Sequence, residues 1–100
     1  MIKKDLVGSD TLAWPVYNDP DRPFIIRTDA SHAGLGAILL QNDENGVQRL
    51  ITYASRSLSA DEIKWDTREQ EALAVIWAAE YFRPFVQGNP FLVYTDHNNL

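Results

Sequence analysis

Hydrophobic residues in the first half of this chain come in short runs that are rich in β-branched and aromatic side chains. Such runs, bounded by turn-forming residues, are typical of strands, and they predict strands over residues 24–29, 35–41 and 49–54. Residues 30–34 form the first predicted turn. Residues 42–46 form the second and contain an Asn-Gly pair, which favours a hairpin. The first half therefore predicts an antiparallel meander of three strands.

The second half of the chain changes to a helical pattern. Residues 59–62 (SADE) and 66–69 (DTRE) each match a capping box, in which the first and fourth residues cap one another. A short helical turn followed by a helix from about residue 67 to 82 is expected. Residues 72–79 are apolar almost all round, which indicates burial on more than one side of that helix.

Pro84 and Gly88 are expected to end the helix. Residues 91–95 predict a fourth strand, and residues 96–100 are typical of the opening of another helix. A helix between two strands is a crossover, so the fourth strand should lie parallel to the first, with a right-handed connection. The predicted fold class is therefore α/β, with a mixed sheet of three antiparallel strands, a crossover helix and a fourth strand parallel to the first.

One domain is expected, since the chain has 100 residues. The segment before the first strand is rich in turn formers, with three Asp or Asn and two Pro in residues 18–23. This composition marks a boundary. We interpret residues 1–22 as a connecting segment and residues 23–100 as the domain proper.

Composition narrows the possible functions. The chain has no cysteine, which excludes a disulfide scaffold and Cys-ligated metal sites and is compatible with an intracellular location. No apolar run approaches the ~20 residues that cross a bilayer, so no membrane partner is expected. The net charge of −5 argues against a free-standing nucleic-acid binder, but it suits a site where several carboxylates hold a cation.

Three acids occupy positions where a charge is costly. Asp29 and Asp96 each follow an apolar strand, and Glu71 opens the most apolar part of the helix. Ligand sites in such sheets gather at the carboxyl ends of the strands. If the helix packs across the first and fourth strands, the three carboxylates converge on one point.

Converged carboxylates repel one another unless a cation neutralises them. Hard oxygen ligands suit Mg²⁺ or Mn²⁺, and two such ions about 4 Å apart support phosphodiester hydrolysis. Each acid also has a simpler interpretation. Asp29 could be a turn former, Asp96 a helix N-cap, and Glu71 a partner of Arg68. With 14 acids in the chain, spacing alone leaves these alternatives open.

Local sequence adds a resemblance to a known family. Four segments resemble, in order, parts of the ribonuclease H domain of gypsy-type LTR-retrotransposon reverse transcriptases. They are residues 23–31 (PFIIRTDAS) with 34–41 (GLGAILLQ), residues 51–58 (ITYASRSL), residues 67–78 (TREQEALAVIWA) and residues 91–100 (FLVYTDHNNL). Residues 12–15 (LAWP) resemble the segment that joins the polymerase and ribonuclease regions. The resemblance thus covers nearly the whole chain.

This resemblance implies a ribonuclease H-like fold and cleavage of RNA in an RNA–DNA hybrid with two divalent metal ions, Mg²⁺ or Mn²⁺. By motif, it implies Asp29, Glu71 and Asp96 as catalytic metal ligands. Glu71 is preferred to Glu69 because it directly precedes the apolar run. The family carries a fourth acidic ligand after the Thr-Asp-His motif, and this sequence has no residues there, so the domain is expected to be incomplete at its C-terminus.

A second group of residues is expected to contact the substrate through backbone or side-chain groups: Ser31, Gly34, Ser55, Arg56 and His97. The expected partners are the hybrid itself and the polymerase region of the same polyprotein.

Two functional interpretations remain. The first is a metal-dependent endonuclease domain that acts during reverse transcription. The second is a non-catalytic remnant of the same fold that serves as a structural or interaction module. An unrelated α/β binding domain would require the matching segments to coincide by chance.

Overall fold

A computed structural model describes residues 12–95 of the chain. Its elements, in order, are β1 (Phe24–Ala30), β2 (Gly34–Asn42), β3 (Gln48–Ser57), η2 (Glu62–Lys64), α1 (Thr67–Tyr81), α2 (Arg83–Val86) and β4 (Phe91–Thr95). The strands form a sheet in the order β3-β2-β1-β4, with β1 antiparallel to β2 and parallel to β4. The predicted fold class is therefore confirmed, and each predicted strand is present.

The two hairpins end in turns that their sequences favour. Between β2 and β3, Gly46 adopts a φ of 80°, a conformation that glycine tolerates best. The Asp43 carboxylate accepts hydrogen bonds from the backbone N–H groups of Asn45 and Val47, both at 2.9 Å. Between β1 and β2, the backbone N–H of Ser31 donates to the Gly34 carbonyl at 2.9 Å. These turns fix the register of the antiparallel meander.

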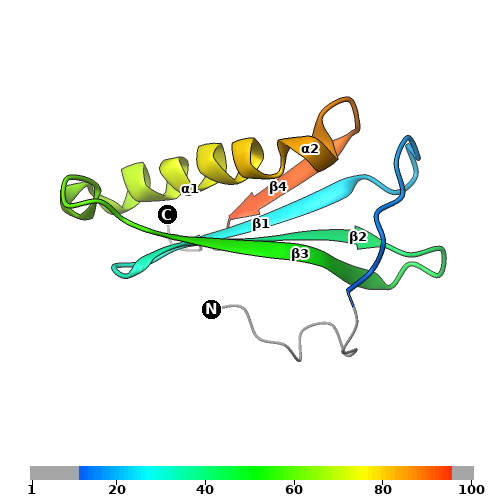
Figure 1. The fold of residues 1–100 in the computed structure, drawn as a ribbon, viewed down its shortest axis with the longest axis horizontal. Coiled ribbons are helices and arrows are strands. Elements are labelled where there is room, and N and C mark those ends of the chain that lie inside the picture. The colour runs from blue at the N-terminus through cyan, green and yellow to red at the C-terminus, as the bar shows by residue number, and fades with distance from the viewer. Residues whose placement is uncertain (1–11, 96–100) are drawn as a thin grey trace.

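The path of the chain brings three element ends together. β3 runs in the direction of β1, because each is antiparallel to β2. The chain then returns through α1 along one face of the sheet and enters β4, which runs parallel to β1 (Figure 1). Consequently, the first turn of α1 and the carboxyl ends of β1 and β4 lie at the same end of the molecule, which we call the carboxyl edge.

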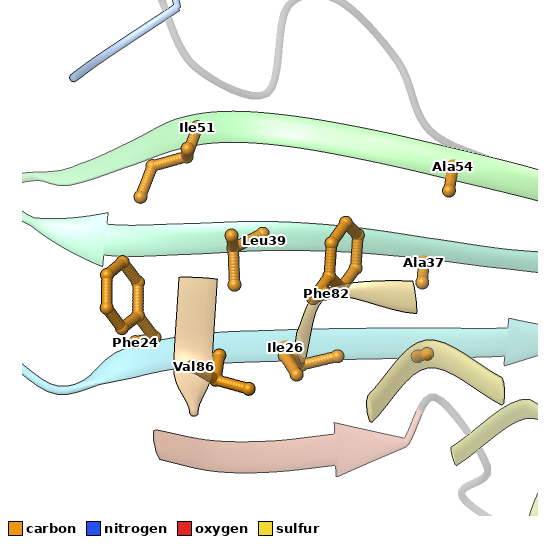
Figure 2. Close-up of a cluster of buried hydrophobic side chains, with 9 residues drawn as sticks. Phe24, Ile26, Ala37, Leu39, Ile51, Ala54, Phe82 and Val86 are labelled. Carbon is orange, nitrogen blue, oxygen red and sulfur yellow. The ribbon is translucent and has the colours of Figure 1, made fainter. Parts of the chain in front are cut away.

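The main core lies between the sheet and the helices. Phe82 and Ala78 from the helical segment, with Val86 of α2, pack on inward-facing residues of the first three strands (Figure 2). These strand residues are Phe24, Ile26, Ala37, Leu39, Ile51 and Ala54. Phe82 has no exposed surface, and it makes an edge-to-face contact with Phe85. A smaller cluster of Ile25, Ile38, Leu40 and Leu50 belongs to the other face by strand alternation.

The expected burial of α1 on more than one side is wrong for the part of the chain that the structure describes. Within α1 only Gln70, Ala74 and Ala78 are buried, whereas Ile76 is 63% exposed and Tyr81 56%. The reason is that a single sheet covers one side of the helix. Trp77 is partly buried and packs against two of the buried clusters.

Both capping boxes are present. Ser59 and Glu62 exchange backbone-to-side-chain hydrogen bonds at 2.8 and 3.1 Å, and Asp66 and Glu69 do the same at the start of α1. α1 ends at Tyr81, close to the predicted end. Pro84 then lies in the first turn of α2, where a proline costs no hydrogen bond. Gly88, at a φ of 81°, follows α2.

Residues 12–22 are held against the sheet by hydrogen bonds. The side chain of Gln41, 4% exposed, accepts from the Val16 N–H at 2.9 Å and donates to the carbonyls of Val16 and Arg22, both at 2.8 Å. We call this arrangement the Gln41 clamp. The Ala13 N–H also donates to the Leu50 carbonyl at 2.8 Å. The domain boundary at residue 23 stays a prediction. None of the helices in the described range has the length and apolar character to span a membrane.

Candidate functional site

Asp29 is the second-last residue of β1 and lies at the carboxyl edge. It is partly buried and pairs in register with Gly36 of β2. Thr28 is buried at 3% exposure, and Ala30 packs with Ala74 of α1, so both neighbours of Asp29 face the helix. By strand alternation Asp29 belongs to the opposite, open face of the sheet, together with Arg27.

Glu71 lies in the second turn of α1 and is partly buried. By three- and four-residue spacing it shares a helical face with Ala74, Ala78 and Phe82, which are fully buried against the sheet. Ala74 packs with Leu35 and Ala30, the residues that pair at the end of β1. Glu71 is one turn before Ala74 and therefore lies toward the carboxyl edge, where β1 carries Asp29.

Asp96 and His97 lie outside the described residues. Within residues 12–95, no three acidic, histidine or cysteine side chains gather in a way that could hold a metal ion. The structure thus brings Asp29 and Glu71 to the same end of the molecule from two different elements. The convergence of all three acids stays a prediction.

A groove of about 810 Å³ opens on the face of the sheet opposite α1. Asp29 lines it, and so do three of the residues expected to contact substrate, Ser31, Gly34 and Ser55. Ser31 and Ser55 are exposed. The groove also includes Arg27, Tyr53 and Tyr94, so it combines a carboxylate, hydroxyl groups, a guanidinium and aromatic rings.

Arg27 and Tyr94 form a contact that was not predicted from the sequence. The Arg27 guanidinium carbon lies 5.3 Å from the centre of the Tyr94 ring, within the range of a cation–π interaction. The two residues are register partners on the parallel strands β1 and β4. Combining the predicted parallel pairing with strand alternation would have placed them on one face.

Arg56, a predicted substrate contact, is engaged within the domain. Its Nη2 donates to Glu62 Oε2 at 2.9 Å, and Glu62 Oε1 accepts from the Ser59 N–H at 2.8 Å. The Glu62 side chain is only 13% exposed. The Arg56 hydrogen bond, then the Ser59 N–H, lower the pKa of Glu62 from its ordinary value of 4.5 to about 2. This ion pair joins the end of β3 to η2.

Gln70 extends this contact to α1. Its side chain is 7% exposed, and its amide donates to the carbonyls of Glu62 at 3.1 Å and Ile63 at 3.3 Å. The amide satisfies two carbonyls of η2 from the first turns of the helix. The sequence identified Ser59–Glu62 as a cap, but it gave no sign that Arg56 and Gln70 would meet there, because both contacts depend on the tertiary packing of η2.

Glu62→Gln should destabilise the protein in a pH-dependent way. The folded-state pKa lies below the unfolded value, so the stabilisation is present above pH 4.5 and is lost as the pH falls toward 2. In urea unfolding followed by circular dichroism, the difference between wild type and Glu62→Gln should be largest near neutral pH and shrink across that window. Asp19 and Asp43, whose pKa values are also lowered by hydrogen bonds, titrate in both proteins and cancel in the difference.

A matched control is Glu44→Gln in the exposed β2–β3 turn, which should change stability little at neutral pH. A difference between wild type and Glu62→Gln that stays constant from pH 7 to 2 would contradict the ionic contact between Arg56 and Glu62.

Comparison with known proteins places the chain in a family. Residues 19–100 match the family described as the RNase H-like domain found in reverse transcriptase. The chain is 41% identical over 99 residues to the retrovirus-related Pol polyprotein from transposon 412 of Drosophila melanogaster, covering 99% of the chain and 8% of that protein. It is 39% identical over 85 residues to the Pol polyprotein from transposon gypsy of the same organism, covering 84% of the chain and 8% of that protein.

Solved structures agree with the fold. The foamy viral protease-reverse transcriptase dRH in complex with double-stranded DNA aligns with a TM-score of 0.69 at 19% identity, over 94% of this chain and 16% of that one. The same viral enzyme in complex with an RNA/DNA hybrid aligns with a TM-score of 0.61 at 22% identity, over 82% of this chain and 11% of that one. The family match and the Pol relatives show that this chain belongs to the RNase H-like domains found in reverse transcriptase, of the kind carried by gypsy-type retrotransposons.

Proposed function

We propose that this chain is part of a ribonuclease H domain that hydrolyses the RNA strand of RNA–DNA hybrids during reverse transcription, with Asp29, Glu71 and Asp96 as metal ligands. The observation that carries the proposal is the placement of Asp29 and Glu71 at one end of the molecule, in a chain of this family. Asp29 also lines the groove on the open face of the sheet.

The donor chemistry fits a divalent metal. Asp29 and Glu71 offer carboxylate oxygens, which Mg²⁺ and Mn²⁺ prefer over softer ligands. Both residues are partly buried, so a cation bound by either carboxylate would be screened less than at an open surface. When bound, a pair of such ions supplies an activated water and stabilises the leaving oxygen of the phosphodiester.

The groove offers contacts for the nucleic-acid backbone. Ser31 and Ser55 present hydroxyl groups in the groove that Asp29 lines, and Gly34 lines the same groove. With a net charge of −5, this chain is expected to bind a hybrid weakly by itself. It spans only 8% of the transposon 412 polyprotein, and we propose that the polymerase region of the same polyprotein holds most of the substrate.

The test is cleavage of a labelled RNA strand in an RNA–DNA hybrid by the 100-residue chain, with Mg²⁺ or Mn²⁺ and with chelator. Asp29→Asn should lower the rate by about a hundredfold or more, since loss of even an outer contact to a metal ligand costs about 10–100-fold. The matched control is Asp61→Asn, an exposed aspartate beside η2 that makes no side-chain cap; it should cleave like wild type.

Two results would overturn the proposal. Cleavage that persists in chelator, or that is equal in wild type and Asp29→Asn, would exclude Asp29 as a metal ligand. Absence of cleavage by a chain that circular dichroism shows to be folded would favour the second interpretation, a non-catalytic module with the same fold.

A further inference from the structure

Arg56, Glu62 and Gln70 link the start of α1 to the end of β3, and none of them is a predicted metal ligand. Arg56 is the register partner of Leu35 on β2, and Leu35 pairs with Ala30, the residue after Asp29. On the helix side, Gln70 directly precedes Glu71. The contacts from Arg56 to Glu62 and from Gln70 to the carbonyl of Glu62 therefore connect the end of β3, which is two strands away from β1 and Asp29, to the start of α1, which carries Glu71.

Each link is short, and Glu62 and Gln70 are largely shielded from solvent. The Arg56–Glu62 distance is 2.9 Å, with the side chains 35% and 13% exposed. The Gln70 amide, 7% exposed, donates to two carbonyls of η2. The second amino nitrogen of Arg56, Nη1, is enclosed and has no hydrogen-bond partner among residues 12–95. Glu62 is thus the hydrogen-bonded ion-pair partner of Arg56, and loss of either member leaves the other without that partner.

We propose that Arg56 is a positioning residue that acts through Glu62 and Gln70 to hold the first turns of α1, and with them Glu71, against the carboxyl edge of the sheet. Arg56 touches neither metal nor substrate in this role. The proposal rests on the nuclease function proposed above, because that function makes Glu71 a metal ligand whose position matters. Metal sites depend on such supporting contacts, because ligands must be held to within a fraction of an ångström.

The chain offers a matched control at the other end of the sheet. Arg49 Nε lies 3.1 Å from Asp43 Oδ2, with side-chain exposures of 40% and 20%. This pair is similar in type and exposure to Arg56–Glu62. It lies beside the start of β1, because Arg49 pairs with Gln41 and Gln41 pairs with Phe24. Arg49→Gln therefore removes a comparable ion pair far from the carboxyl edge.

The experiment compares Arg56→Gln with Arg49→Gln in the full chain by two readouts that need no catalysis. Hydrogen exchange of backbone amides should rise about tenfold or more in residues 70–74 of Arg56→Gln and stay unchanged in residues 37–40 of β2. Mn²⁺ affinity, measured from the electron paramagnetic resonance signal of free Mn²⁺, should fall about tenfold in Arg56→Gln. Arg49→Gln should change neither quantity, and Arg56→Lys should restore part of the Mn²⁺ affinity.

Gln70→Met provides a second variant if Arg56→Gln does not fold. It keeps the size and helix propensity of the side chain and removes the two hydrogen bonds to η2. Its exchange and Mn²⁺ affinity should change in the same direction as those of Arg56→Gln.

The outcomes separate this inference from the proposed function. Equal exchange in residues 70–74 of wild type and both variants would overturn the positioning role, and so would faster exchange with unchanged Mn²⁺ affinity. Uniformly faster exchange across the sheet would show a global stability effect and overturn it too. If wild type binds Mn²⁺ in an Arg56-dependent way but does not cleave a hybrid, the positioning role stands and the nuclease function fails.

Discussion

Replacing Phe82 by alanine should lower the free energy of unfolding by about 3–5 kcal/mol, the range for large-to-small changes of an aromatic residue in a protein core. Phe82 has no exposed surface and lies in the main cluster between the helices and the first three strands (Figure 2). It also contacts the rings of Tyr81 and Phe85 edge-on. Since small domains are stable by only about 5–15 kcal/mol, this loss is a large part of the total. Urea unfolding followed by circular dichroism measures it.

The control for Phe82 is Ile76→Ala on α1, the helix that ends just before Phe82. Ile76 is 63% exposed, so its truncation should change stability by no more than about 0.5 kcal/mol. Similar losses for the two variants would mean that α1 packs on the sheet through a different face from the one described.

Gly34→Ala should destabilise the protein by about 1–3 kcal/mol, the cost of forcing extra atoms into a packed site. A Cβ at this position would lie 2.4 Å from the backbone carbonyl oxygen of Arg56 and 3.2 Å from the Cα of Ser57. Both are backbone atoms of β3, so the end of the β2–β3 pair must move apart. We expect a lower thermal unfolding midpoint and faster hydrogen exchange at the ends of β2 and β3.

Gly36, two residues along the same strand, is the control. A Cβ at Gly36 would meet no atom within 4 Å, so Gly36→Ala should be neutral or stabilise slightly by reducing the flexibility of the unfolded chain. If Gly34→Ala were as stable as Gly36→Ala, the close approach of the two strands at Gly34 would be wrong.

The sequence predicted the order and type of the elements well because their signals are local. Alternating apolar runs, an Asn-Gly turn and two capping boxes each lie within ten residues and depend little on the rest of the chain. The parallel placement of β4 beside β1 followed from the crossover that a helix between two strands makes. Residues 91–95 were predicted as a strand and form β4 with those bounds.

The burial of α1 was not predictable in the same way. Residues 72–79 are apolar on nearly every side, so the sequence could not show which side packs on the sheet. The position of the fully buried residues, at Ala74, Ala78 and Phe82, follows from the three- and four-residue spacing that Glu71 shares. The exposure of Ile76 depends on what covers the helix, which is a property of the tertiary structure.

In the candidate site, too, local sequence identified individual residues but not the contacts between elements. Motif resemblance named Asp29 and Glu71, and the structure places both toward the carboxyl edge. The contacts of Arg56 with Glu62 and of Arg27 with Tyr94 join residues from different elements. Their distances depend on strand register and on the position of η2, and neither can be obtained from local sequence.

The Gln41 clamp has a consequence for how the domain can be divided. A buried amide that loses its partners costs about 1–3 kcal/mol, and all three partners of Gln41 lie in residues 16–22. A polypeptide that began at Pro23 would lack all three of these hydrogen-bond partners of the Gln41 amide. Residues 12–22 therefore fold as a strap on this domain. A protease that cut within them would loosen the end of the sheet opposite Asp29.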